Sequence, residues 1–127
     1  MDGFSYKQGG LHAEGVNLDS LAEKLGTPLF VYSLSTLASH LQNMRDAFFL
    51  IDPLICFSVK SCSNLSILKF LVEHGAGLDV VSGGEIYRAL LAGARPETIV
   101  FAGVGKSAEE IKYALEAGVY QFNVESE

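Results

Sequence analysis

The sequence has 127 residues, 49% of them hydrophobic and 19% charged, which is the balance of a folded chain and the length of one domain or part of one. A formal net charge of -6 argues against nucleic acid or an anionic membrane surface as the main partner, because like charges repel. The sequence has no long apolar run and no basic and then apolar leader. We therefore expect a cytoplasmic protein that acts on small molecules, with no nucleic-acid or membrane partner.

The first 17 residues do not follow the periodic pattern of the rest of the chain. The stretch "GLHAEGVNL" reads as one strand of a different structure. Ser20 followed by Glu23 is a capping-box pattern, which predicts a helix that begins before "LAEKLG". The sequence therefore predicts a division into residues 1–17 and residues 18–127.

Short apolar runs alternate with segments of helical period from Thr27 onward, a pattern typical of parallel βα units. Strands are predicted at residues 28–33, 54–60, 77–82, 98–103 and 120–125. Helices are predicted between these strands, and those between the last four have local start and stop signals. Their signals are an apolar stripe (Leu65, Leu68, Leu71, Val72), capping boxes (Ser82 with Glu85, Ser107 with Glu110) and terminal glycines (Gly75, Gly93, Gly118).

The predicted strand ends follow a regular step. They fall near Lys60, Ser82, Gly103 and Glu125, which are 22, 21 and 22 residues apart by subtraction. This step favours an α/β fold of the (β/α)8 TIM-like barrel type, of which the chain would form about the first half. A doubly wound sheet also alternates, but no glycine-rich phosphate turn follows the first strand.

The candidate chemistry lies where these strands end, because the carboxyl ends of barrel strands face the active site. A lysine that leaves an apolar strand, as Lys60 does, is partly desolvated, which favours a free amine able to attack a carbonyl. A solvated lysine at a strand end is the simpler interpretation. Asp79 points away from its neighbours in the strand by alternation, and it suits either a ligand or a structural hydrogen bond. Ser82 begins a "SGGE" segment with backbone amides at a helix start, which helix capping alone also explains.

Other motifs give weaker signals. "AGVGKS" ends like a phosphate loop, but Val100 stands where the first glycine is required, so Lys106 is expected to be solvated. Cys56 and Cys62 are expected to be free thiols. The three histidines stand apart from one another and from the cysteines, so no metal site is predicted.

The segments "FSVKSCSN" and "GAGLDVVSGGEIYRALLAGARPETIVFAGVGKSAEEIKYALEAGV" together resemble the N-terminal half of the pyridoxal-phosphate-dependent decarboxylases of the alanine-racemase-like fold. The upstream "LHAEGVNLDSLAEKLGTPLFVYS" is similar to the diaminopimelate decarboxylases within that group. The likeness covers nearly all of the chain. It departs at Ser61 and Cys62, where the family usually has alanine and asparagine.

This resemblance implies a function and a set of residues. Lys60 would bind pyridoxal 5'-phosphate covalently and act in catalysis, with Asp79 and Ser82 in the cofactor pocket. The reaction would convert meso-2,6-diaminopimelate to L-lysine and carbon dioxide. A C-terminal β domain, to which residues 1–17 would belong, and the rest of the pocket would lie beyond Glu127. The chain would then be a fragment, inactive alone, of a protein that forms a homodimer.

Three alternatives remain open. A decarboxylase of the same fold could act on another basic amino acid. A half-barrel could serve only to bind a cofactor or to associate with another chain. A barrel lysine could also form a Schiff base directly with a substrate carbonyl, as in an aldolase.

Overall fold

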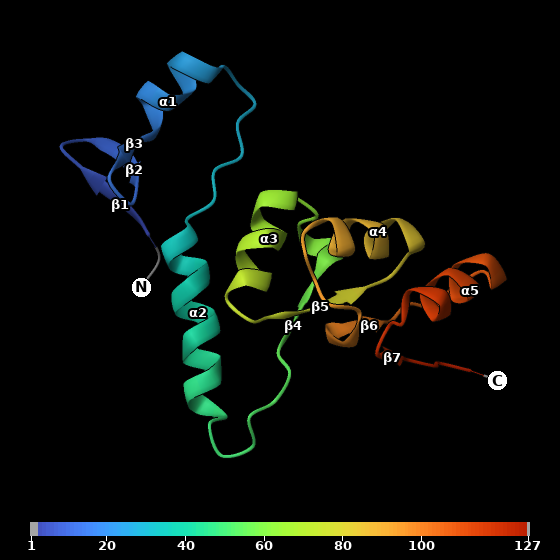
Figure 1. Cartoon of the computed structure of the whole chain (residues 1–127). Coiled ribbons are helices and arrows are strands. Elements are labelled where there is room, and N and C mark those ends of the chain that lie inside the picture. The colour runs from blue at the N-terminus through green and yellow to red at the C-terminus, as the bar shows by residue number, and fades with distance from the viewer. Residues whose placement is uncertain (1–2, 127) are drawn as a thin grey trace. The chain divides into compact units, whose positions relative to one another are not determined.

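Residues 3–126 are described by a computed structural model, in which the chain divides into two units, residues 1–43 and 44–127 (Figure 1). Each unit is described by itself. None of the helices formed by residues 3–126 has the length and apolar character needed to cross a bilayer.

The first unit begins with a small antiparallel sheet of three strands, β1 (Phe4–Lys7), β2 (Gly10–Ala13) and β3 (Val16–Asn17), in the order β1-β2-β3. Gln8 and Gly9 join β1 to β2 with positive φ angles of 52° and 83°, the conformation that a two-residue hairpin turn requires. The stretch predicted as one strand therefore forms two. Glu14 and Gly15 lie at the bend between β2 and β3, which divides the stretch.

Helix α1 (Leu18–Leu25) begins earlier than the predicted capping box. Asn17 is its N-cap, and the side-chain oxygen of Asn17 accepts a hydrogen bond from Ser20 N at 2.9 Å. Ser20 therefore lies inside the first turn, and the Ser20–Glu23 prediction was wrong. Asparagine caps a helix about as well as serine, so Asn17 can start the helix three residues earlier.

The strand predicted at residues 28–33 is absent. These residues have no ladder partner among the described residues, and an extended segment without a hydrogen-bonded neighbour is not a strand. Helix α2 (Leu34–Ala47) follows. Its start is capped by Ser33, whose hydroxyl accepts from Thr36 N at 3.1 Å and donates to Glu14 Oε1 at 2.8 Å.

The second unit is a parallel sheet of four strands in the order β4-β5-β6-β7. The strands are β4 (Cys56–Ser58), β5 (Gly77–Val80), β6 (Ile99–Phe101) and β7 (Gln121–Phe122). Helices α3 (Leu65–Glu73), α4 (Gly83–Leu91) and α5 (Ala108–Ala117) connect them, with short 3₁₀ turns η1 (Val59–Ser61) and η2 (Pro96–Thr98). The strands end 22, 21 and 21 residues apart by subtraction, which confirms the predicted βα rhythm (Figure 1).

The core lies between this sheet and its helices. Leu78 and Val80 of β5 and Ile99 and Phe101 of β6 are fully buried, together with Leu68, Ile86, Ala89 and Ala114 from the three helices. Because side chains alternate along a strand, Asp79 and Val100 lie on the opposite face of the sheet. The predicted strands were too long at their carboxyl ends. The turn η1 begins directly after Ser58, the N-cap Ser82 follows Val80 by two residues, and a loop follows Phe101.

Candidate active site

The face of the sheet that points away from the helices carries small and polar side chains near its carboxyl edge. Ser58, Asp79, Val100 and Gln121 are neighbours across the ladder of β4 to β7. Residues in register in a parallel sheet point to the same side. Ser58 and Asp79 therefore share this face.

Cys56 and Asp79 interact on this face. Burial raises the pKa of the Cys56 thiol, and the negative charge of Asp79 raises it further. A Cβ on Gly77 would lie 2.7 Å from Cys56 Sγ, so glycine leaves the space that the thiol occupies. Both cysteines are free.

Lys60 lies in η1, two residues beyond the end of β4. Its neighbour Val59 is fully buried in the core, whereas Lys60 is exposed. The turn η1 packs against β5, the strand that carries Asp79. The predicted position at a strand end on the carboxyl edge is thus confirmed. Lys60 lies in the 3₁₀ turn and is exposed, so the structure matches the simpler interpretation, a solvated lysine at a strand end, and not the partly desolvated amine.

Ser58 is a candidate that the sequence analysis missed. Its hydroxyl oxygen is buried and has no hydrogen-bond partner among the described residues. A buried polar atom without a partner costs free energy, and in native structures it commonly marks a ligand, an ion or a water. The signal in the sequence was its place two residues before Lys60, on the same face as Asp79.

Three hydrogen bonds from backbone amides to side chains hold the turn between β5 and α4. Val81 N donates to Glu85 Oε2 at 2.8 Å, Glu85 N to Ser82 Oγ at 3.2 Å, and Gly83 N to Glu110 Oε1 at 2.8 Å. Ser82 is therefore the N-cap of α4, as the capping pattern predicted. Its oxygen accepts from Glu85, while the hydroxyl proton remains a donor that can bind a ligand.

Glu110 joins two helix starts. One carboxylate oxygen accepts from Gly83 at the start of α4, and the other accepts from Ser107 N at 3.1 Å in the capping box of α5. The bond from Gly83, and then the bond from Ser107, lower the pKa of Glu110. The Gly83 amide is consequently not free to bind an anion, contrary to the sequence-based expectation for "SGGE".

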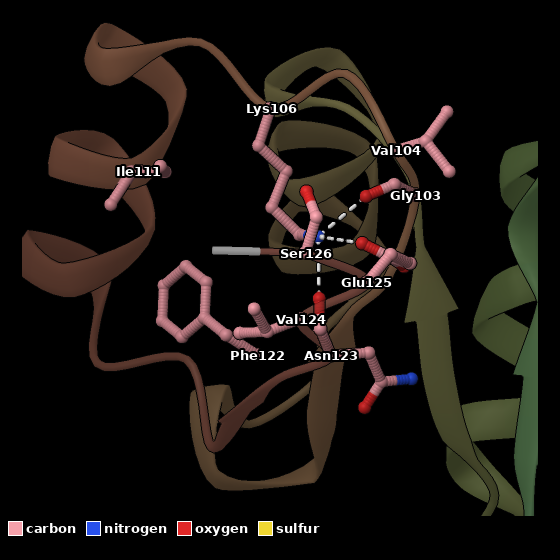
Figure 2. A pocket seen from close by; sticks show the side chains of 9 residues that line it. All are labelled: Gly103, Val104, Lys106, Ile111, Phe122, Asn123, Val124, Glu125 and Ser126. Atoms are coloured by element: carbon pink, nitrogen blue, oxygen red, sulfur yellow. Dashed lines mark hydrogen bonds and ion pairs between the residues drawn. The ribbon is translucent and has the colours of Figure 1, made fainter.

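Lys106 differs most from expectation, because its side chain is only 10% exposed and the sequence predicted a solvated amine. Its ammonium contacts Gly103 O, Asn123 O and Glu125, and it lines a cavity of about 340 Å³ at the ends of β6 and β7 (Figure 2). The apolar part of the lining comes from the side chains of Val104, Ile111, Phe122 and Val124. Within residues 3–126, no group of three His, Cys, Asp or Glu could hold a metal ion.

The described residues form a parallel βα sheet that carries Ser58, Lys60 and Asp79 at or just after the carboxyl ends of its strands, an arrangement typical of part of a (β/α) barrel. Residues 34–127 match the family described as "Pyridoxal-dependent decarboxylase, pyridoxal binding domain". The chain belongs to this family. Its cofactor is pyridoxal phosphate, and the sheet is part of the family's N-terminal barrel.

Known proteins extend the match. The chain is 48% identical over 126 residues to diaminopimelate decarboxylase of Pseudomonas fluorescens, covering 99% of this chain and 30% of that protein. The crystal structure of diaminopimelate decarboxylase from M. jannaschii in complex with L-lysine matches with a TM-score of 0.90 and 35% identity, over 98% of this chain and 31% of that one. The crystal structure of lysine decarboxylase from Selenomonas ruminantium matches with a TM-score of 0.79 and 25% identity, over 96% of this chain and 31% of that one. The chain spans about 30% of the relatives' length.

The described residues fit pyridoxal phosphate. The amine of Lys60 is exposed at the carboxyl edge, where it can condense with an aldehyde. Ser58 offers a buried hydroxyl without a partner, and Asp79 adds a carboxylate on the same face. The fit concerns the ring and aldehyde side of the cofactor, because the Gly83 amide that could have held a phosphate is already bound to Glu110.

Proposed function

We propose that the full polypeptide carrying this sequence decarboxylates meso-2,6-diaminopimelate to L-lysine and carbon dioxide with pyridoxal phosphate. The observation that carries the proposal is the 48% identity to a diaminopimelate decarboxylase over 126 residues. The position of Lys60 beyond β4, at the edge where Asp79 and Ser58 meet, supports it. This chain covers 30% of that decarboxylase, so the proposed activity is assigned to the full polypeptide.

Three residues have proposed roles. Lys60 Nζ would hold the cofactor through its aldehyde, and as a free amine it would donate a proton to the substrate carbon that loses its carboxylate. Asp79 and Ser82 line the cofactor site, one as a carboxylate and the other through its remaining hydroxyl proton. When bound, the pyridinium ring supplies an electron sink for the carbon–carbon bond that breaks.

The test is borohydride reduction of the full-length protein with pyridoxal phosphate, followed by peptide mass measurement. We expect a pyridoxyl adduct on Lys60, visible absorbance, and carbon dioxide release from meso-diaminopimelate. Lys60→Ala should abolish all three. Lys69→Ala is the matched control, because Lys69 is an exposed lysine of α3 that pairs with Glu73. An unmodified Lys60, or activity retained by Lys60→Ala, would refute the assignment.

A second candidate is decarboxylation of another basic amino acid. The likeness to a lysine decarboxylase supports it, at 25% identity against 48% for the first candidate. A substrate panel of meso-diaminopimelate, L-lysine, L-ornithine and L-arginine separates the two. Release of carbon dioxide from L-lysine but not from meso-diaminopimelate would favour the second.

The wider organisation also belongs to this proposal. Residues 1–17 would join a β domain and residues 18–127 the barrel, in a cytoplasmic homodimer. The separate antiparallel sheet of β1 to β3 supports the first part. Analytical ultracentrifugation of the full-length protein tests the dimer, and a monomer at all concentrations would exclude it.

A further inference from the structure

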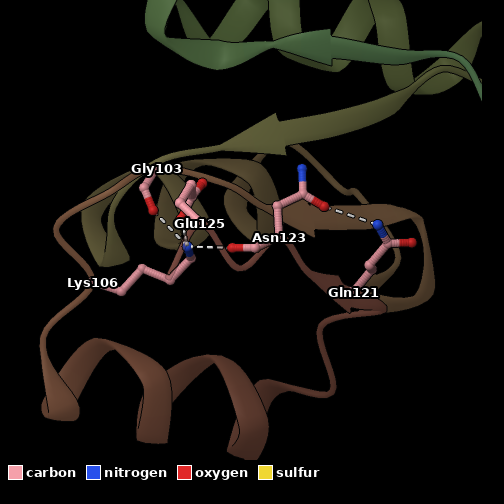
Figure 3. Close-up of polar contacts among 5 residues, drawn as sticks. All are labelled: Gly103, Lys106, Gln121, Asn123 and Glu125. Atoms are coloured by element: carbon pink, nitrogen blue, oxygen red, sulfur yellow. Dashed lines mark hydrogen bonds and ion pairs between the residues drawn. The ribbon is translucent and has the colours of Figure 1, made fainter. Parts of the chain in front are cut away.

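The segments that follow β6 and β7 meet at one largely buried ammonium, that of Lys106. Lys106 lies in the connection between β6 and α5, and Figure 3 shows its side chain reaching across to the end of β7. We propose that Lys106 is a positioning residue, which fixes the spacing of the ends of β5, β6 and β7 at the cofactor edge of the sheet. The proposal deepens the proposed function and rests on it for the cofactor, but not for the geometry.

The ammonium of Lys106 uses all its donors on the protein. It donates to Gly103 O at 2.5 Å, to Asn123 O at 2.6 Å and to Glu125 Oε2 at 3.4 Å. A lysine has three donors, so none remains for a phosphate or a substrate carboxylate. The "GKS" sequence therefore does not mark an anion site here.

The two carbonyl bonds carry the argument. Glu125 is 41% exposed and its oxygen is the most distant acceptor, and pairs that are open to solvent contribute little. The shorter bonds to the carbonyls of Gly103 and Asn123 join the second residue after β6 to the first residue after β7. The ring of Phe101 lies 5.6 Å from the ammonium, which is within the range of a cation–π contact.

The connection continues from β6 to β5. Gly103 has a φ of +98°, and a Cβ there would lie 3.3 Å from Val81 Cβ. Glycine thus allows the loop after β6 to rest against the residue that separates Val80 from Ser82. Lys106 binds the carbonyl of Gly103, and the neighbouring amide of Ala102 donates to Val80 O at 2.8 Å, two residues before Ser82. A shift of the Lys106 ammonium would consequently displace Ser82, a proposed cofactor contact.

Amide hydrogen exchange of the full polypeptide without cofactor tests the geometry. The bonds Ala102 N to Val80 O and Asn123 N to Phe101 O join the ends of β5, β6 and β7. The bond Gly77 N to Ile55 O lies at the opposite edge of the sheet. In Lys106→Met we expect exchange at Ala102 and Asn123 to speed up by about tenfold or more, with Gly77 unchanged.

Two further variants keep the test decisive. Lys106→Arg retains the charge and donors and should restore part of the protection. Lys112→Met removes an exposed lysine of α5 that pairs with Glu116 and should leave all three amides as they are. Equal acceleration at Ala102, Asn123 and Gly77 would mean a general loss of stability and would overturn the positioning role, as would no acceleration.

The cofactor arm uses the dissociation constant of pyridoxal phosphate, measured from the visible absorbance. Lys106→Met should weaken binding by about tenfold, Lys106→Arg by less, and Lys112→Met should not change it. If wild type forms no adduct on Lys60, the proposed function fails while the exchange result still stands. If wild type binds and Lys106→Met binds equally well, the positioning role is wrong and the proposed function is untouched.

Discussion

The pKa of the Cys56 thiol depends on the charge of Asp79. This pKa is raised first by burial and then by that charge, so the thiol is less reactive at neutral pH. Asp79→Asn removes the charge and leaves the shape. We expect the pKa of Cys56 to fall, and its alkylation by iodoacetamide at a fixed pH to become faster. The check is the rate of Cys56 alkylation at a series of pH values, followed by peptide mass spectrometry.

The matched control is Asp52→Asn. Asp52 is exposed, lies four residues before Cys56, and has a φ of 41° that asparagine also tolerates. Its charge is not a cause of the Cys56 shift. An unchanged rate in Asp79→Asn would show that the two side chains do not share a face, and the candidate site would lose its geometry.

Glu110 should stabilise the fold in a pH-dependent way. Hydrogen bonds from Gly83 and Ser107 hold its pKa below its ordinary value of 4.5. A carboxyl with a lowered folded-state pKa stabilises the fold above its unfolded value, and the stability is lost as the pH falls through the folded one. Glu110→Gln should therefore lower the denaturation midpoint at pH 7, and the gap from wild type should narrow below about pH 4.5.

Glu109→Gln is the control for this change, because it removes the same charge from the same first turn of α5. Glu109 is exposed and should have a smaller effect at pH 7. Equal effects of the two variants would mean that the helix dipole, and not the bridge to Gly83, explains the stability.

Single residues were predictable where the strand period alone decides their direction. Asp79 lies opposite Leu78 and Val80 because side chains alternate. Lys106 was not predictable, because its acceptors are backbone carbonyls of Gly103 and Asn123, the second of them 17 residues away. A sequence shows side chains but not which carbonyls remain unpaired at a strand end, and the orphan hydroxyl of Ser58 was missed for the same reason.

The seam between β5 and its neighbours depends on a glycine. A Cβ on Gly77 would lie 2.6 Å from Thr98 O, a backbone atom, and 2.7 Å from Cys56 Sγ. Gly77→Ala should therefore cost about 1–3 kcal/mol of the free energy of unfolding, as overpacking typically does. Urea denaturation measures it. At Gly84, where the nearest atom is 3.9 Å away, alanine should be neutral or stabilise by up to about 1 kcal/mol.

Comparing the change in unfolding free energy of Gly77→Ala with that of Gly84→Ala separates the effect of packing in the folded state from the effect of chain entropy in the unfolded state. Alanine restricts the unfolded chain at both positions, which favours folding. If Gly77→Ala matches Gly84→Ala, the strands can separate enough to admit a methyl group. The close register of Cys56 with Gly77 would then be incorrect.

Helices were predicted better than strands because their caps are local. The capping box of Ser107 and Glu110 and the left-handed Gly118 are present as expected. A strand needs a partner that the local sequence does not contain. Residues 28–33 had the composition of a strand and formed none, whereas the four strands that pair with one another did form.

The whole second unit follows from the repeated βα step, because a parallel strand must return over a helix before it can pair again. The order β4-β5-β6-β7 is the simplest result of that rule. The step does not specify how the sheet ends. Among the described residues, β4 and β7 each have a neighbour on one side only.

These open edges predict self-association of the 127-residue polypeptide. Unpaired strand edges and exposed apolar side chains favour pairing with another chain. On the β7 side, Leu115 is 63% exposed and Val124 is 79% exposed. We expect size-exclusion chromatography with light scattering to show a mass that rises with concentration.

Charges on the β7 side test which edge is involved. The double variant Leu115→Lys with Val124→Lys should shift the polypeptide toward monomer, because a charged edge resists pairing. Leu25→Lys is the control, since Leu25 has the same 63% exposure but belongs to α1 in the other unit. A wild-type polypeptide that stays monomeric at every concentration, or a Leu25→Lys variant that acts like the double variant, would contradict association through the β7 edge.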